Sequence, residues 1–307
     1  MRTALLGNLQ VSVVGLGCNN FGRALDAEQS ARVVHAALDA GMNHFDTASN
    51  YGEGQSESFL GAALGGHREE VVIATKVGVE IPGWEGSGGA RPEYVRQVLE
   101  RSLSELRTDY VDIYMIHFPD PETPIEDTLE VLQELVEKGK ARAIGCSNFD
   151  PEQLTDALEV SAAKGYQGFV CDQVQYSMVH REPETNGLSE LCVSRGVALL
   201  PYYPLANGLL TGKTRRGGEP QGRLKMDRYQ DFLTDENFDL VERLDAYARE
   251  RDLTMVQVAL GWLLAQEAVP AVTAGATSPE QVASNALAAE WDPSAEDLIA
   301  LEAAVTG

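Results

Sequence analysis

The sequence has few cysteines, and they lack the spacings that serve metal binding or redox chemistry. Among 307 residues there are four, at Cys18, Cys146, Cys171 and Cys192. No two of them form a Cys-x-x-Cys pair, so neither a zinc ribbon nor a dithiol redox site is indicated. We expect reduced thiols, as is usual in a cytosolic protein.

Long apolar runs are also missing. No stretch approaches the roughly 18 consecutive apolar residues that a membrane-spanning helix needs. The apolar stretch within residues 1–8 is too short for a signal peptide. We therefore expect a cytoplasmic protein that does not enter a membrane.

Basic residues are scarce, with 24 Lys and Arg against 47 Asp and Glu, a formal net charge of −23. Such a field repels nucleic-acid phosphates and anionic lipid, so we expect neither as a partner. Such a negative net charge is typical of a very soluble protein, or of a protein from a cell with a high salt concentration. A phosphate-bearing cofactor would then need a locally positive site. The most basic stretch is the irregular segment 204–234, a candidate phosphate clamp or lid, with Lys213, Arg215, Arg216, Arg223, Lys225 and Arg228.

What the chain does have is a regular alternation of short apolar strands and longer amphipathic helices. The predicted strands are 11–16, 43–45, 71–75, 111–116, 141–145, 170–174, 197–200 and 269–273. The predicted helices are 27–40, 57–64, 92–106, 125–138, 188–195, 238–249, 255–266 and 295–304, with two more beginning at Pro151 and Pro279. Asp26 with Gln29, and Asp150 with Gln153, are expected helix caps.

Eight strands joined by helical crossovers predict a parallel α/β sheet. Eight units close naturally into a (β/α)8 TIM barrel, for which about 250 residues plus insertions are typical. We expect one barrel domain over residues 1–307, although the length also allows two domains and an open doubly wound sheet is the competing fold. Residues 3–6 are expected to pair with residues 10–12 as a β-hairpin that covers the barrel floor.

Four titratable residues follow three neighbouring predicted strands. Asp46, Lys76 and His117 stand at strand ends, and Tyr51 lies in the loop after Asp46. Each alone has an ordinary structural explanation, such as a turn residue or a buried imidazole. Because barrel enzymes place their chemistry on the loops after the strands, the four together predict one catalytic site.

These residue types suit the reduction of a carbonyl, which needs a hydride on carbon and a proton on oxygen. A free tyrosine, with a pKa of about 10, is a slow proton donor at neutral pH. The ammonium of Lys76 would lower that pKa, and the carboxylate of Asp46 would keep Lys76 protonated. His117 would donate a hydrogen bond to the substrate oxygen. No nucleophile is required, and the histidines lack the spacing of metal ligands, so no metal is expected.

The sequence around these residues resembles the aldo-keto reductase family, in particular its bacterial members and its potassium-channel β-subunit-like branch. The resemblance rests on segments 41–61, 73–76, 112–117, 144–149, 173–176, 202–205 and 208–213, and it covers essentially the whole chain. It implies the (β/α)8 fold. It also implies a catalytic tetrad of Asp46, Tyr51, Lys76 and His117.

The resemblance further implies how a nicotinamide cofactor and a small carbonyl substrate would bind. Ser147, Asn148 and Gln173 would bond the carboxamide, and Tyr202 would stack beneath the ring. At Gly17 the backbone would come close to the cofactor. The remaining implied cofactor residues are Pro204, Leu205, Gly208 and Lys213 along the pyrophosphate, and Gly275, Ser278, Gln281 and Asn285 at the adenine end. The expected substrate wall, with residues 81–90 as a covering loop, comprises Asn19, Asn20, Phe21, Trp84, Phe118 and Tyr203.

One departure from the family pattern concerns the cofactor's 2′-phosphate. The family often has an Arg at or just before Gln281, whereas segment 275–281 contains no basic residue. NADP(H) remains favoured and NAD(H) stays open, with Lys213, Arg215 or Arg216 as substitutes in space. Gly15 and Gly17 begin a dinucleotide fingerprint that ends in Asn, so a Rossmann fold is a weak alternative.

Two other functions stay open at this stage. A cofactor-binding redox-sensing or regulatory subunit would have the same residues but little turnover. A double-bond reductase of the family's steroid branch would have Glu where His117 stands, which disfavours it. The sequence specifies neither the substrate, an aldehyde, ketone or keto-sugar, nor the oligomeric state.

Overall fold

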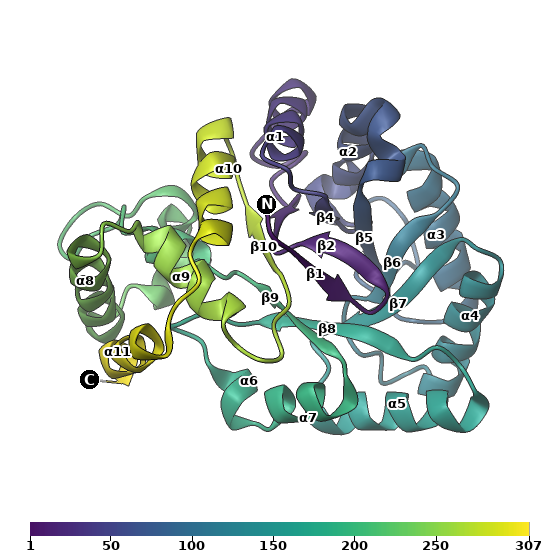
Figure 1. Cartoon of the computed structure of the whole chain (residues 1–307). Coiled ribbons are helices and arrows are strands. Elements are labelled where there is room, and N and C mark those ends of the chain that lie inside the picture. Colours follow the sequence, from purple (N-terminus) through teal and green to yellow (C-terminus); the bar gives the residue numbers. More distant parts are fainter. Residues whose placement is uncertain (307) are drawn as a thin grey trace.

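The computed structural model describes residues 1–306 and contains one large parallel sheet that curves into a barrel (Figure 1). Its strands lie in the order β10-β3-β4-β5-β6-β7-β8-β9. The N–H of Leu199 donates to the carbonyl of Ala268 (2.8 Å), which joins the two ends of the sheet. The predicted (β/α)8 barrel is thus confirmed, with strands β3 (Val14–Gly17), β4 (His44–Asp46), β5 (Val72–Val77), β6 (Val111–Ile116), β7 (Ala141–Ser147), β8 (Phe169–Gln175), β9 (Ala198–Tyr202) and β10 (Val272–Gly275).

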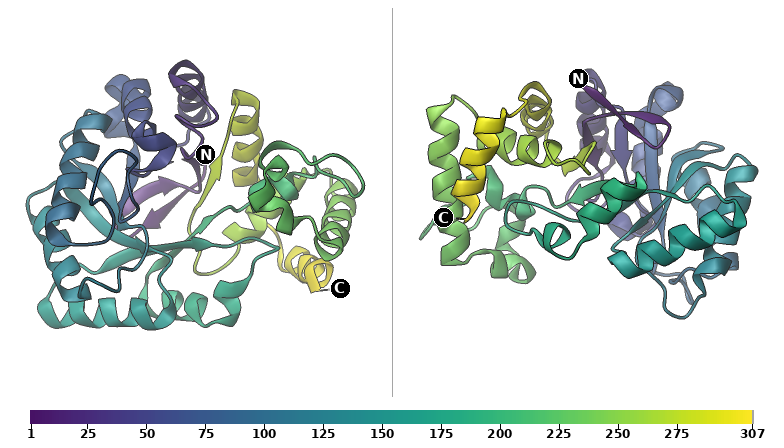
Figure 2. Two further views of the ribbon diagram at one scale, coloured as in Figure 1. Left: turned by 180° about the vertical axis from the view of Figure 1, so that it is seen from behind. Right: turned by 60° about the horizontal axis from the view of Figure 1, so that its bottom comes forward.

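The helices surround the barrel (Figure 2). They are α1 (Ala27–Asp39), α2 (Ser56–Leu64), α3 (Pro92–Leu106), α4 (Ile125–Glu137), α5 (Pro151–Lys164), α6 (Glu182–Thr185), α7 (Leu188–Arg195), α8 (Asp235–Glu250), α9 (Met255–Leu264), α10 (Pro279–Ala286) and α11 (Ala295–Thr306). Capping boxes at Asp26 and Asp150 are confirmed: each carboxylate accepts the N–H of the glutamine three residues on. Within residues 1–306, no helix is both long and apolar enough to cross a bilayer.

The predicted N-terminal hairpin is also confirmed. Strands β1 (Thr3–Leu6) and β2 (Leu9–Ser12) pair antiparallel across one end of the barrel (Figure 1). Leu6 and Val11 are fully buried against inward-facing residues of the barrel strands. Because these side chains fill the end at which the strands begin, they leave the opposite mouth for loops and ligands.

Two strand predictions were wrong in detail. The single strand 11–16 is divided at Val13, because Ser12 accepts and donates hydrogen bonds with Asn43 and Val14 that end the hairpin before β3 begins. The last strand begins at Val272 and not at Val269, since the N–H of Val269 still closes a turn onto Gln266.

The irregular segment after β9 has three short 3-10 turns, η3 (Ala206–Thr211), η4 (Gly222–Lys225) and η5 (Asp227–Phe232). We call residues 213–232 the strap. The strap lies with α8 on one side of the barrel (Figure 2). It therefore stands next to the ends of β9 and β10, where the predicted cofactor residues are.

Candidate active site

The four predicted catalytic residues meet at the carboxyl ends of three neighbouring strands. Asp46 ends β4, Lys76 lies near the end of β5, and His117 follows β6. Tyr51 opens the 3-10 turn η1 (Tyr51–Gly54). The Nζ of Lys76 donates to both carboxylate oxygens of Asp46 (2.8 and 2.9 Å) and lies 3.5 Å from the hydroxyl of Tyr51. The rings of Tyr51 and His117 meet edge to face with centroids 5.7 Å apart.

Lys76 has no exposed surface, yet its surroundings keep it charged. Burial alone would lower the pKa of its ammonium, but Asp46 and then Tyr51 raise it, and the net pKa lies above the usual value. The carbonyl of Thr47 accepts the third hydrogen bond of the ammonium (2.8 Å). Lys76 is thus a fixed positive charge directed at the phenol.

Two opposing influences act on Tyr51. Burial raises the pKa of the phenol, whereas the charge and hydrogen bond of Lys76 lower it, and the net pKa is above its ordinary value. Lys76 therefore acts in the predicted direction, although burial outweighs it in this structure. The phenol therefore stays protonated at neutral pH, as the predicted role of proton donor requires, and Lys76 would reduce the free-energy cost of losing that proton.

His117 is held as a neutral imidazole. Burial, followed by repulsion from Lys76, lowers its pKa to about 3. Its Nδ1 is enclosed and has no hydrogen-bond partner among the described residues, so Nε2 is the nitrogen that a substrate oxygen can reach. The ring stacks on Phe118, with centroids 5.3 Å apart. A neutral imidazole can donate one N–H to an oxygen that develops negative charge.

The residues predicted to bind the nicotinamide lie beside this tetrad. The Ser147 hydroxyl donates to the carbonyl of Gln173 (2.6 Å), and the Gln173 side chain donates to Asp46 (3.0 Å). Asn148 has a left-handed backbone (φ 62°) and accepts a hydrogen bond from the hydroxyl of Tyr202 (2.9 Å). Strands β7, β8 and β9 thus present one connected polar face to the mouth.

The strap contributes Arg223, which sequence reasoning named only as one member of a basic stretch. Its guanidinium donates to the side-chain oxygens of Asn19 (2.6 Å) and Asn20 (2.7 Å) and lies 5.9 Å from the Tyr203 ring. The side chain of Asn20 also donates to the carbonyl of Ala276 (3.2 Å). Arg223 therefore links the strap to the loops after β3 and β10, a contact between distant segments that leaves no local signal in the sequence.

Arg215 and Arg216 have carboxylate partners instead. Arg215 pairs with Asp245 (3.0 Å), and Arg216 pairs with three acids at the start of α8, namely Asp235, Asp239 and Glu242. Their charges are compensated on the outer side of the strap. This weakens the expectation that either replaces the missing arginine at the adenine end.

At the adenine end, the predicted residues surround the beginning of α10. Ser278 caps the helix by accepting the N–H of Gln281, and the side-chain oxygen of Gln281 accepts the N–H of Thr277 (2.8 Å). Asn285 is buried one turn further on. Gly275, at the end of β10, pairs with Gly17 of β3. Segment 275–285 contains no Lys or Arg that could bind a 2′-phosphate.

The predicted substrate wall is only partly assembled in the structure. Phe118 is 49% exposed at the mouth, and Tyr203 is half-buried with a left-handed backbone (φ 53°). Trp84, in the 81–90 loop, packs edge to face on Tyr94 (5.6 Å). Phe21 departs from expectation, since its side chain is fully buried in the core and offers no surface to a substrate.

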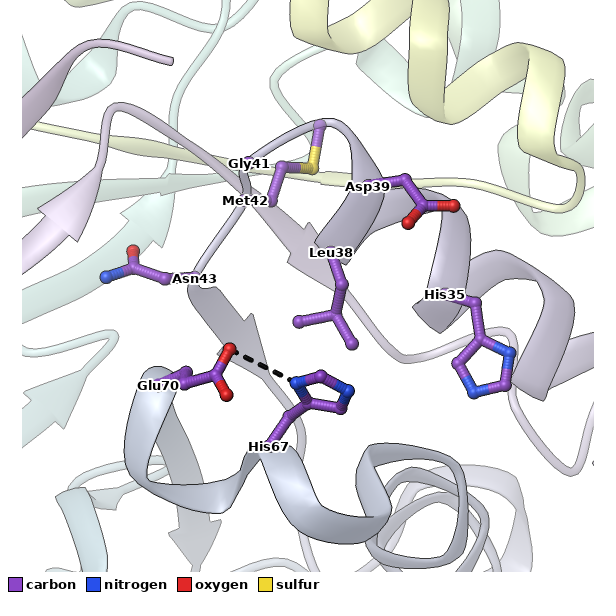
Figure 3. A pocket seen from close by; sticks show the side chains of 8 residues that line it. All are labelled: His35, Leu38, Asp39, Gly41, Met42, Asn43, His67 and Glu70. Atoms are coloured by element: carbon purple, nitrogen blue, oxygen red, sulfur yellow. Dashed lines mark hydrogen bonds and ion pairs between the residues drawn. The ribbon is translucent and has the colours of Figure 1, made fainter.

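A separate hollow of about 430 Å³ lies between the last turns of α1, the loop before β4 and the segment before β5 (Figure 3). His67 and Glu70, which share a hydrogen bond of 3.1 Å, line one side of it. Asn43, which directly precedes β4, lines another side. It includes none of the tetrad residues and lies where the strands begin, so it is not the catalytic mouth. No cluster of three or more candidate metal ligands exists among residues 1–306.

Comparison with known proteins gives a consistent result. The model of the aldo/keto reductase family matches residues 13–305. The chain is 33% identical to L-glyceraldehyde 3-phosphate reductase of Escherichia coli K12 over 90% of its own length and 84% of that protein. It is 31% identical to a probable voltage-gated potassium channel subunit beta of Arabidopsis thaliana, over 93% and 89% of the two chains.

Two solved structures of aldo-keto reductases are also similar to this chain. Aldo-keto reductase AKR11C1 from Bacillus halodurans, in its holo form, superposes with a TM-score of 0.83 at 31% identity, over 99% of this chain and 96% of that one. The thermostable aldo-keto reductase Tm1743, in complex with the inhibitor epalrestat, gives a TM-score of 0.80 at 31% identity, over 99% and 100%.

Proposed function

The chain belongs to the aldo/keto reductase family, and from this premise we propose that it reduces a small aldehyde, ketone or keto-sugar to the alcohol. The reduction uses a nicotinamide dinucleotide as hydride donor and Tyr51 as proton donor. The observation that supports this best is the buried ammonium of Lys76, which bonds Asp46 and faces the hydroxyl of Tyr51 at 3.5 Å.

The chain's own residues divide the work at the carbonyl. A reduced nicotinamide, when bound, supplies the hydride. Tyr51 gives its phenolic proton to the substrate oxygen, and Lys76 stabilises the phenolate that remains. His117, neutral because burial lowers its pKa to about 3, orients that oxygen through Nε2. Asp46 keeps Lys76 charged throughout.

The residues present fit a nicotinamide dinucleotide. The side-chain oxygen of Gln173 accepts no hydrogen bond from the described residues and is an acceptor for the carboxamide, next to Ser147. Arg223 bonds only amide oxygens, so its positive charge is uncompensated and suits a phosphate of the cofactor. Lys213, exposed at the start of the strap, is a second such cation.

Between the two dinucleotides, we favour NADP(H) because the family generally uses it. NAD(H) stays a real alternative, since segment 275–281 lacks a basic residue and Arg215 and Arg216 are bound to acids of α8. Of the three strap cations expected to replace the missing arginine, Arg215 and Arg216 are paired with acids, so Lys213 is the remaining candidate for the 2′-phosphate.

A second candidate function follows from the relatives named as channel β subunits. In that function the chain binds the cofactor and senses its redox state with little turnover. The tetrad is complete, which favours the enzyme, because a sensor needs the cofactor residues but no proton donor.

The test is the loss of reduced-nicotinamide absorbance with NADPH, and separately with NADH, against 4-nitrobenzaldehyde and glyceraldehyde 3-phosphate. Many turnovers per chain with either cofactor support the reductase, and the ratio of the two kcat/KM values identifies the cofactor. A single oxidation per chain, with tight cofactor binding, would support the sensor instead.

A further inference from the structure

Gln173 makes a contact that a cofactor-binding role alone does not require. Its side-chain nitrogen donates to Oδ1 of Asp46 at 3.0 Å, although 127 residues separate the two in sequence. Strands β8 and β4 are not neighbours, since three strands stand between them in the sheet. The contact therefore crosses the mouth of the barrel. Both side chains are buried, with 2% and 5% exposed surface.

The chemistry of the pair determines which way the amide is turned. A carboxylate only accepts hydrogen bonds, so the nitrogen of Gln173 must face Asp46. Its oxygen is then left as an acceptor. The same Oδ1 atom of Asp46 accepts from Lys76 at 2.8 Å, so Gln173 and Lys76 hold one carboxylate oxygen from two sides.

The backbone of Gln173 is equally engaged. Its carbonyl accepts the hydroxyl of Ser147 (2.6 Å) and the N–H of Asn148 (3.0 Å). One residue thus supports the turn after β7, offers an acceptor to the carboxamide and restrains the carboxylate that orients Lys76. Among residues 1–306, no other predicted cofactor residue forms a hydrogen bond with the carboxylate of Asp46.

We propose that Gln173 is a positioning residue that couples occupation of the nicotinamide site to the proton-donating set, by fixing Asp46 and through it the ammonium facing Tyr51. This rests on the proposed function, because it assigns the carboxamide to the free oxygen of Gln173. The donated hydrogen bond also neutralises part of the charge of Asp46. Its removal makes the potential at Lys76 and Tyr51 more negative and favours their protonated forms.

The test compares Gln173→Met with Ser147→Ala. Gln173→Met removes the donor to Asp46 and adds no charge. Ser147→Ala removes a neighbouring polar group of the predicted carboxamide site and leaves the bond between Gln173 and Asp46 in place. In the reduction direction, activity falls as pH rises through the apparent pKa of the Tyr51–Lys76 pair. We expect this alkaline limb to move up by about 0.5 pH unit or more in Gln173→Met, and by less than about 0.2 unit in Ser147→Ala.

If the alkaline limb lies at the same pH in the wild type and both variants, while cofactor affinity is reduced in both variants, the coupling is overturned. Gln173 would then be a cofactor contact only. Urea unfolding of each variant shows whether it is folded, so that a loss of structure is not mistaken for a shift of the pH profile. A wild-type chain without turnover would count against the proposed function instead. The coupling is then judged from the pH dependence of NADPH binding, measured by fluorescence quenching, where the same upward shift in Gln173→Met supports it and an unshifted curve overturns it.

Discussion

In the proposed reaction, burial and charge have different effects on proton donation by Tyr51. The phenol is buried, which raises its pKa and retains the proton at neutral pH. The ammonium, charged because of Asp46, then stabilises the anion formed when the proton leaves. Neither residue alone gives a donor that is both protonated and ready to react.

Replacement of Tyr51 by Phe removes the proton donor and little else. We expect turnover to fall by about 100-fold or more, because general acid catalysis contributes factors of this size. Cofactor affinity should stay nearly unchanged, since the hydroxyl has no predicted contact with the dinucleotide. Steady-state kinetics with fluorescence titration of the cofactor checks both. Wild-type rates in Tyr51→Phe would refute the assignment of the proton donor.

Asp172 is a buried carboxyl that the proposed reaction does not use. Its side chain is fully buried, and burial raises its pKa to about 7 against weaker lowering by the nearby backbone N–H of Phe149 and thiol of Cys146. The folded state therefore retains a proton that the unfolded state loses near pH 4. Its contribution to stability is full below pH 4 and is lost as pH rises to about 7.

From this we predict that Asp172→Asn becomes more stable relative to the wild type as pH rises. Between the two pKa values the gain in unfolding free energy grows by about 1.4 kcal/mol per pH unit, and it is constant above them. Urea unfolding at pH 5 and pH 8 measures it, with the exposed Asp231→Asn as a matched control. Parallel stability curves for Asp172→Asn and wild type would show that Asp172 does not titrate as described.

At the scale of elements, the sequence predicted the barrel well because each unit has its own local signals. Capping boxes at Asp26 and Asp150 and the proline that opens α3 marked helix starts correctly. Strand ends placed Asp46, Lys76 and His117 on one rim, because parallel strands share a direction. The bend at Val13 was missed, since it depends on the hydrogen bonds between Ser12 and Asn43, which lie 31 residues apart in sequence.

The strap was the least predictable element. Its composition indicated a basic loop, but which cations face the site depends on packing against distant segments. Arg216 looks like a phosphate ligand in sequence yet bonds acids of α8, whereas Arg223 bonds the loop after β3. Phe21 was misplaced for a different reason, because a local turn that closes onto Cys18 and Leu25 holds its side chain in the core.

Replacement of Arg223 by Met should therefore weaken cofactor binding more than the same change at Arg216. We expect a loss of affinity of about tenfold or more for Arg223→Met, which is the usual size of a lost charge-assisted hydrogen bond. Arg216→Met, on the same strap but paired with acids, should change affinity by less than about twofold. Titration of NADPH fluorescence measures the affinity of both variants. Equal losses of affinity would show that binding depends on the total charge of the strap and not on the position of Arg223.

On the scale of the whole molecule, the net charge of −23 acts against the approach of an anionic dinucleotide. The repelling charges are spread over the surface, whereas Arg223 acts at contact distance within the mouth. Salt separates the two effects, because raising ionic strength from about 0.01 M to 0.1 M shortens the Debye length from about 30 Å to about 10 Å. Distant repulsion is then largely screened, while a partly enclosed pair is screened much less.

We therefore expect the association rate constant of NADPH to rise with salt over this range, by roughly threefold, with little change in the dissociation rate constant. Stopped-flow fluorescence measures both, and KCl should match NaCl because screening depends on ionic strength and not on the ion. Most binders of anionic ligands behave oppositely, since a positive funnel is weakened by salt. An association rate that falls with salt would mean that Arg223 and Lys213 extend an attractive field beyond the mouth. The acidic surface would then contribute to solubility without slowing the encounter.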